Sequence, residues 1–206
     1  IILDRILTSH KKKKIRIRED KKRIVVGWTG APWTRKKDLE CIRVLAKYIV
    51  NNNHRFRLLH IGHHDSKTSF AEVLGIPEIC VEKKPLKGHQ EYIDSIDFDI
   101  GLAPLTQNNF NYHKSGIKVI EYSHFGIPWI ASKQNTYESL SAEWGIYGRL
   151  CTKEQEWIEH LEELCNYNLY NDESTMLQKI CREKASFENG VKKWKTIFNI
   201  LKIEFN

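Results

Sequence analysis

The sequence predicts an α/β fold, with helices on both faces of a parallel sheet. Three observations support this prediction. From residue 23 onward, short runs rich in β-branched residues alternate with helical patterns, as is typical of βαβ units. Several of these elements end at glycine, which stops helices and opens turns. A length of 206 residues, 41% of them hydrophobic, is enough for one sizeable core. Ligands are then expected beyond the carboxyl ends of the strands, because crossovers between parallel strands are right-handed.

Each element follows from a local pattern. The run RIVVGWTG predicts a strand that enters a glycine turn, and KKDLECIRVLAKYIV predicts an amphipathic helix. The helix before Gly126 and Pro128 should end there, because glycine readily adopts the left-handed conformation and proline cannot continue a helix. After residue 150 the pattern is helical throughout. Strands are expected at residues 23–30, 56–64, 78–83, 98–105 and 128–132, and helices at 36–50, 69–75, 89–96 and 114–125.

The net charge of +7 is concentrated at the start of the chain. Residues 1–23 contain ten basic and three acidic residues, which leaves 23 of each sign for the rest. Residues 1–22 are therefore interpreted as a basic linker or tail, and residues 23–206 as one folded domain. A solvated arm is the ordinary explanation of such a run, and weak contact with anionic lipid or RNA phosphates is the alternative. Because the folded part is neutral, nucleic acid is not an expected partner.

The same tail has no sustained apolar run and no small-residue cleavage site. It therefore predicts neither a membrane span nor a signal peptide. The sequence does not begin with Met, and we expect that a preceding domain was connected through this tract.

The cysteines and histidines predict neither a disulfide scaffold nor a metal site. Five cysteines form no C-x-x-C pair, which favours a reducing, cytoplasmic compartment, with at most peripheral membrane contact, over a disulfide scaffold. The most metal-like cluster lacks a second ligand pair at suitable spacing, so no metal site is predicted. That cluster comprises His60, His63, His64 and Asp65.

The segment from residue 109 to residue 132 places three charges in an otherwise apolar stretch. At about 100° per residue, Lys114, Lys118 and Glu121 share one narrow stripe of the predicted helix, and apolar residues cover much of the remainder. One explanation is an i,i+3 ion pair between Lys118 and Glu121, which contributes about 0.3 kcal/mol when exposed. The other is a ligand.

The second explanation specifies the chemistry of the ligand. A helix start at Ser115 and Gly116 offers unpaired backbone N–H groups and a positive dipole end, which suit a phosphate. Lys114 and Lys118 add charge for a diphosphate, and the carboxylate of Glu121 can accept from the paired hydroxyls of a ribose. The pattern therefore predicts a nucleotide-sugar site.

Four segments, in this order, resemble the carboxyl-terminal domain of group 1, retaining, GT-B fold glycosyltransferases. They are GWTGAPWTRKKDL, FDIGLAPL, FNYHKSGIKVIEY and GIPWIAS. The resemblance covers roughly residues 23–140, with a less specific similarity in the VKKWKTIF ending. It implies a Rossmann-like domain that forms one half of a GT-B fold, with a helical carboxyl-terminal region.

The resemblance also implies roles for single residues. Family members have a glutamate, seven intervening residues and a second glutamate that binds the donor ribose; Glu121 matches the second. The first, which contacts the transferred sugar, falls at His113, and this departure leaves the sugar contacts open. His113 is expected either to donate to a sugar hydroxyl or phosphate oxygen, or to be a solvated helix cap.

The first strand and turn have family counterparts as well. Thr29 stands near the place of the family's arginine, and Gly30 suits a backbone that approaches a ligand or turns sharply. Arg35, Lys36 and Lys37 are candidates for the position of the family's lysine, which is directed at the donor diphosphate; Lys37 is favoured, with Lys36 next. The alternative is that both lysines simply occupy the exposed first turn of a helix.

Taken together, the resemblance implies transfer of a sugar from a nucleoside diphosphate sugar to an acceptor hydroxyl with retention. No metal or other cofactor is required, and the nucleobase is expected near residues 83–89. The acceptor, a glycan or lipid-linked glycan, belongs to a missing amino-terminal domain, so this chain should bind nucleotide without efficient turnover. The catalytic set is Lys37, Lys114, Lys118 and His113, and the donor-binding set is Thr29, Gly30, Lys36, Ser115, Gly116 and Glu121.

Two other functions remain open at this point. One is a GT-B-like sugar-nucleotide epimerase or phosphorylase. The other is a non-catalytic module that uses the same scaffold for protein contacts and the basic tail for membrane or RNA contact, because a fold does not fix a function.

Overall fold

The computed structural model describes residues 23–62, 68–85, 92, 95–145 and 149–200. Within these residues the chain forms a six-stranded sheet in the order β3-β2-β1-β4-β5-β6, and every neighbouring pair is parallel. This confirms the predicted α/β class. The strands are β1 (Ile24–Thr29), β2 (Phe56–Gly62), β3 (Val81–Pro85), β4 (Ile100–Ala103), β5 (Trp129–Ser132) and β6 (Arg149–Cys151).

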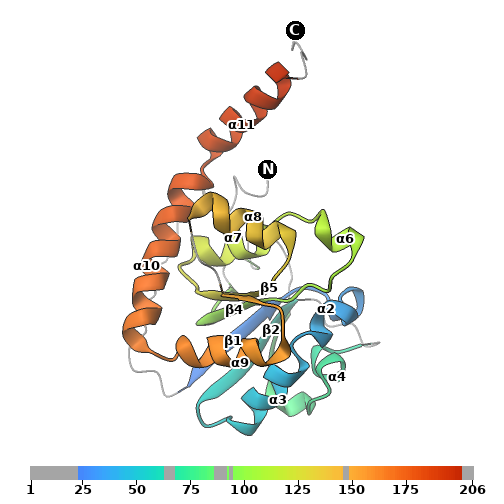
Figure 1. The fold of residues 1–206 in the computed structure, drawn as a ribbon. Helices are drawn as coiled ribbons and strands as arrows, with labels where there is room; N and C mark the ends of the chain where they lie inside the picture. Colours follow the sequence, from blue (N-terminus) through green and yellow to red (C-terminus); the bar gives the residue numbers. More distant parts are fainter. Residues whose placement is uncertain (1–22, 63–67, 86–91, 93–94, 146–148, 201–206) are drawn as a thin grey trace.

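Helices cover both faces of the sheet (Figure 1). On one face lie α2 (Lys36–Glu40), α3 (Arg43–Asn51), α4 (Phe70–Leu74) and α9 (Glu154–Glu163); on the other lie α7 (Ile117–His124) and α8 (Asn135–Trp144). All residues of β1, β4 and β5 are buried, as expected for parallel strands that pack on both faces. Two apolar clusters, one on each face, form the core.

The carboxyl-terminal part of the chain is helical, as predicted. Helix α10 (Tyr167–Lys184) packs against α7, and its Tyr170 hydroxyl donates to the carbonyl of Asp99 at 3.0 Å. Helix α11 (Phe187–Ile200) extends away from the body of the domain (Figure 1). None of the described helices has the length and apolar character needed to traverse a bilayer.

Close packing of α7 against Gly101 in β4 fixes the position of this helix. A Cβ atom on Gly101 in β4 would lie 2.4 Å from the ring of Tyr122 in α7, so the helix can approach the strand only because that side chain is absent. The Tyr122 hydroxyl donates to the carbonyl of Leu102 at 3.1 Å. These two contacts hold α7 against β4.

Three sequence predictions about elements need correction. The helix expected at 36–50 is two helices, α2 and α3, because the Ile42 N–H bonds to the Leu39 carbonyl in a tighter turn. The region after residue 150, expected to be wholly helical, begins with the end of β6, an edge strand only three residues long. Such a short strand carries too little pattern to be detected.

The third correction concerns the helix expected at 114–125. It is replaced by a one-turn helix α6 (Asn109–Tyr112) and by α7, which starts only at Ile117. The Asn108 side chain caps α6, and the Thr136 hydroxyl donates to the Lys114 carbonyl in the connection. Lys114 therefore lies before the helix instead of on its stripe. Most of the helix expected at 89–96 lies outside the described residues.

Candidate functional site

A cavity of about 490 Å³ opens at the carboxyl ends of β1 and β4. The strand order reverses between these two strands, and ligands of doubly wound sheets bind at such a point. We call it the switch-point cavity. The turn after β1, the start of α2, the exit of β4 and the segment from α6 into α7 form its walls; among its described lining residues are Thr29, Gly30, Arg35, Asp38, Lys114, Ser115, Lys118 and Glu121.

Lys118 connects the first turn of α7 to the end of β1. Its ammonium donates to the Thr29 carbonyl at 2.6 Å and to the Thr29 hydroxyl at 3.0 Å, and it lies 5.4 Å from the centre of the Trp28 ring. Burial lowers the pKa of Lys118 to about 8, although the charge of Glu121 opposes this effect. At neutral pH the side chain is therefore a partly desolvated cation in the cavity wall.

Glu121 is held by a tyrosine that the sequence patterns did not identify. Its carboxylate, on a residue only 8% exposed, accepts from the Tyr92 hydroxyl at 2.7 Å, and the Tyr92 and Thr29 hydroxyls lie 3.3 Å apart. Burial and the negative charge of Glu121 raise the pKa of Tyr92, so the hydroxyl stays protonated and donates. Lys118 and Glu121 are electrostatically coupled, yet each has a separate hydrogen-bond partner.

Asp38 organises the other side of the cavity. One carboxylate oxygen accepts from the Thr106 N–H at 2.9 Å, the Thr106 hydroxyl at 2.7 Å and the Asn111 amide at 2.7 Å. Burial opposes ionisation, but these hydrogen bonds and the charge of Lys114 offset it and lower the pKa of Asp38. Asp38 thus joins α2 to the β4 exit and to α6.

Two further cations line the cavity around that carboxylate. The Lys114 ammonium lies 3.5 Å from Asp38 and 4.9 Å from the centre of the Phe110 ring. Burial lowers the pKa of Lys114, although the charge of Asp38 opposes this effect. Arg35 lies 3.7 Å from the same carboxylate. Among its described lining residues, the cavity has three cations and two carboxylates, which suits an anionic ligand.

The structure brings together only part of the predicted set. Thr29, Gly30, Lys114, Ser115, Lys118 and Glu121 all line the switch-point cavity. Gly116 is the N-cap residue of α7, and an added Cβ there would lie 3.1 Å from Leu140. Gly30 has a φ of 145°, which glycine adopts readily, and its carbonyl accepts from His60 Nε2 at 2.9 Å.

Three predicted residues lie elsewhere. Lys36 and Lys37 are exposed on α2 and are not among the described lining residues, whereas their neighbour Arg35 is. His113 is exposed at the end of α6, with its ring against the edge of Tyr112 at 5.1 Å. The roles predicted for these three residues stay predictions.

The weak metal-like cluster is only partly described. His60 is buried and packs in a cluster of three mutually stacked rings with Trp28 and Phe70, whereas His63, His64 and Asp65 lie outside the described residues. Across the described ranges no three potential ligand side chains gather. Most of the predicted base-binding loop, residues 86–89, is likewise outside the described residues. The five cysteines all lie within the described ranges and are free thiols.

No family model and no curated protein matches the sequence, but solved structures match the fold. The chain is similar to TarM (TM-score 0.64, 19% identity, 90% of this chain and 37% of that chain). It is also similar to the O-GlcNAc transferase of Thermobaculum terrenum, with a TM-score of 0.63 and 16% identity over 86% of this chain and 35% of that chain. A third similar structure is HepE of Anabaena in complex with UDP-glucose, with a TM-score of 0.62 and 15% identity over 86% of this chain and 49% of that chain.

These similarities define the architecture of the chain. It spans 35 to 49% of the length of those three structures, which are GT-B glycosyltransferases. The chain therefore has the fold of one half of a GT-B glycosyltransferase, as predicted.

Proposed function

We propose that this chain is the donor-binding half of a group 1, retaining glycosyltransferase, which transfers a sugar from a nucleoside diphosphate sugar to an acceptor hydroxyl. One observation carries the proposal. The cations Arg35, Lys114 and Lys118 and the carboxylate of Glu121 line one cavity at the switch point of the sheet. The motif resemblance and the fold support the same conclusion.

The diphosphate is proposed to bind at the start of α7. There, backbone N–H groups of the first helical turn and the helix dipole favour an anion, and Ser115, Lys114 and Lys118 lie beside it in the cavity wall. Negative charge grows on the diphosphate as the sugar leaves. Fixed cations aimed at that charge stabilise the transition state more than the ground state. Because three side-chain cations are available, the proposal includes no metal.

The ribose is proposed to bind at Glu121. A carboxylate accepts hydrogen bonds from two adjacent hydroxyls, and the Tyr92 hydroxyl orients this carboxylate. Lys36, Lys37 and His113 are proposed to contact the donor only in the complete protein, because all three are exposed in this chain.

The acceptor is proposed to bind mainly through the half that this chain does not span. The similar structures are two to three times longer than the region matched. A glycan or a lipid-linked glycan is the expected acceptor. We therefore expect nucleotide binding by this chain without efficient transfer.

A thermal-shift panel with UDP, GDP, ADP and CMP tests the proposal. A ligand at 100 times its dissociation constant stabilises the folded state by about 2.7 kcal/mol, so at least one nucleoside diphosphate should raise the melting temperature. A flat panel would contradict the proposal. Salt-dependent binding to anionic vesicles together with a flat panel would instead favour the non-catalytic module.

The variant Glu121→Gln makes the test specific. The amide oxygen can still accept from Tyr92, so the melting temperature of the ligand-free protein should change little while the nucleotide-induced shift is lost. The matched control is Glu159→Gln, which changes an exposed glutamate on α9 and should leave the shift intact. An unchanged shift in Glu121→Gln would refute the ribose-binding role.

A further inference from the structure

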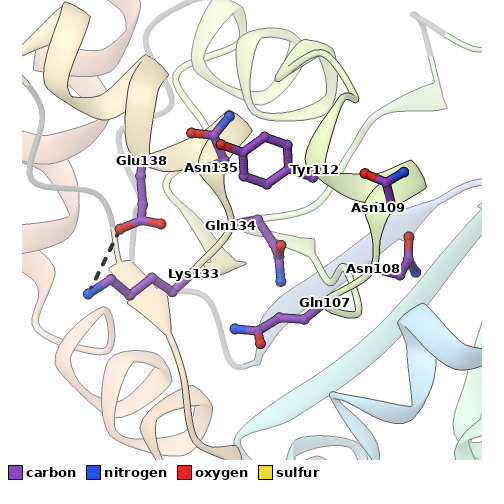
Figure 2. Close-up of a pocket in the computed structure, with 8 residues that line it drawn as sticks. All are labelled: Gln107, Asn108, Asn109, Tyr112, Lys133, Gln134, Asn135 and Glu138. Carbon is purple, nitrogen blue, oxygen red and sulfur yellow. Dashed lines mark ion pairs between the residues drawn. The ribbon is translucent and has the colours of Figure 1, made fainter.

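A second cavity, of about 580 Å³, lies on the other side of α6. The connection after β4 and the connection from β5 into α8 form its walls, so it opens at the same edge of the sheet as the switch-point cavity, one strand further along. Figure 2 shows the side chains around it, with the amides of Gln107 and Gln134 pointing into the gap from the two connections. We call it the amide-lined cavity.

The lining of this cavity is dominated by carboxamides. Among its eight described lining residues, five are amides: Gln107, Asn108, Asn109, Gln134 and Asn135. A carboxamide offers two donors and an acceptor on one rigid plane. Hydroxyl groups also both donate and accept, so a row of amides matches a ligand that carries several hydroxyls.

Two of these amides are fixed by the backbone. The Asn108 side-chain oxygen caps α6 by accepting from the Asn111 N–H at 2.8 Å. This hydrogen bond does not involve the side-chain nitrogen of Asn108. Gln134, which is buried, donates to the Leu105 carbonyl at 3.5 Å. Their positions are therefore set before a ligand binds, which lowers the entropy cost of binding.

The charge of the cavity favours a neutral ligand. Lys133 and Glu138 form an ion pair at 3.8 Å (Figure 2), and no other charged residue is among the described lining residues. Tyr112 is 52% exposed and contributes an aromatic ring that can cover the apolar face of a sugar ring while its hydroxyl stays in water.

Helix α6 separates the two cavities and contributes to both. Phe110 lines the switch-point cavity, whereas Asn109 and Tyr112 line the amide-lined cavity. At the start of α8, Tyr137 lines the switch-point cavity and Glu138 lines the amide-lined cavity. A ligand in one cavity therefore lies directly across a shared wall from a ligand in the other.

We propose that the amide-lined cavity is a second binding site that takes a neutral saccharide through its hydroxyl groups. We further propose that this saccharide is part of the acceptor and lies beside the donor sugar. This second step rests on the proposed function, whereas the proposal that a saccharide binds here does not. Hydrogen bonds from the amides select hydroxyls, and the compensated lysine and glutamate disfavour phosphorylated sugars.

Saturation-transfer difference NMR on the full chain without nucleotide tests this site. The probes are maltotriose, cellotriose and diacetylchitobiose, with glucose 6-phosphate as the charged comparison. At least one neutral saccharide should receive saturation, and glucose 6-phosphate should not bind at this site. If none of the neutral probes receives saturation, the proposal is wrong.

Two variants localise the binding. Tyr112→Ala and Gln107→Ala change exposed side chains and should each weaken saccharide binding about tenfold, as expected when an anchor of a small interface is removed. Tyr167→Ala is the matched control, because Tyr167 is a tyrosine 41% exposed on α10, and it should have no effect. Unchanged binding in both cavity variants would overturn the assignment.

The failure of this proposal can be distinguished from failure of the proposed function. Glu121→Gln should lose UDP binding and retain saccharide binding, whereas Tyr112→Ala should do the reverse. Saccharide binding with a flat nucleotide panel would support the second site alone, and nucleotide binding without saccharide binding would reject it.

Discussion

The two cavities lie at the same edge of the sheet, yet the fold treats their polar groups differently. In the switch-point cavity, charged side chains are buried or half-buried and are held by specific partners, as for Asp38, Glu121 and Lys118. In the amide-lined cavity most polar groups are uncharged and exposed, and the two charged residues, Lys133 and Glu138, pair with each other. Burying charge is costly unless partners or a ligand compensate. From this difference we infer that the first cavity suits an anionic ligand and the second a neutral one.

Asp38→Ala should damage both cavities. Its carboxylate accepts from Thr106, which precedes α6, and from Asn111 within α6, the helix that separates the cavities. We expect the free energy of unfolding to fall by about 3 kcal/mol, because several buried donors lose their acceptor, and binding of both ligands to weaken.

Urea unfolding measures the effect of Asp38→Ala. The control is Asp172→Ala, an exposed aspartate on α10, which should change stability by less than about 0.5 kcal/mol. Equal stability of the two variants would show that Asp38 does not hold the cavity wall.

Lys118→Met should affect ligand binding in the switch-point cavity alone. A charge-assisted hydrogen bond contributes about 1.5 to 3 kcal/mol, so the affinity for UDP should fall by roughly 10- to 150-fold, while saccharide binding is unchanged. Calorimetric titration measures both affinities. Lys47→Met, on the exposed face of α3, is the control. A similar loss of saccharide affinity would contradict the separation of the two sites.

The pH dependence should separate the cavities as well. With a pKa near 8, Lys118 loses its proton above pH 8, whereas Asp38, whose pKa is lowered, stays ionised and Tyr92, whose pKa is raised, stays protonated. UDP affinity should therefore fall above pH 8, by up to about tenfold per pH unit, and saccharide affinity should stay constant. A flat UDP profile between pH 7 and 10 would contradict the role of this lysine.

The pKa of Lys118 should also make the free energy of unfolding depend on pH, in the direction opposite to that of the UDP affinity. The unfolded-state pKa of this lysine is the ordinary 10.5, so between pH 8 and pH 10.5 the unfolded chain binds more protons than the folded chain. The contribution of Lys118 to the free energy of unfolding therefore rises with pH in this window, and the burial of Lys114 acts in the same direction. Lys118→Met should reduce the rise, which urea unfolding at several pH values can measure.

Tyr92→Phe should give the smallest of these effects. Loss of one hydrogen bond to Glu121 should reduce UDP affinity about fivefold, corresponding to roughly 1 kcal/mol. Tyr48→Phe is a matched control. The Tyr48 hydroxyl also donates to a glutamate, Glu162, at 2.6 Å, but neither residue lines either cavity. The control should lower stability to a similar extent without changing UDP affinity. Equal UDP affinities in the two variants would show that Tyr92 does not orient the ribose-binding carboxylate.

The sequence predicted the features that repeat along the chain. Alternating strands and helices specified the α/β class, and helical spacing placed Lys118 and Glu121 together on α7. It did not predict Asp38 or Tyr92, because their roles depend on contacts between distant segments, such as that of Asp38 with Asn111, which lies 73 residues further along the chain. Arg35 was only one of three candidates beside the favoured Lys37 and Lys36, and it is the one of the three that lines the cavity. Lys114 was placed on the wrong element because asparagine capping creates α6 as a separate turn.

Helix α6 is one turn long and forms a wall of both cavities. A ligand that shifts this turn changes the affinity of the opposite cavity, and thermodynamic linkage requires the same factor in the reverse direction. Nucleotide and saccharide should therefore sense each other's occupancy through a single helical turn. The cooperativity of the two substrates would then depend on a helix of only four residues.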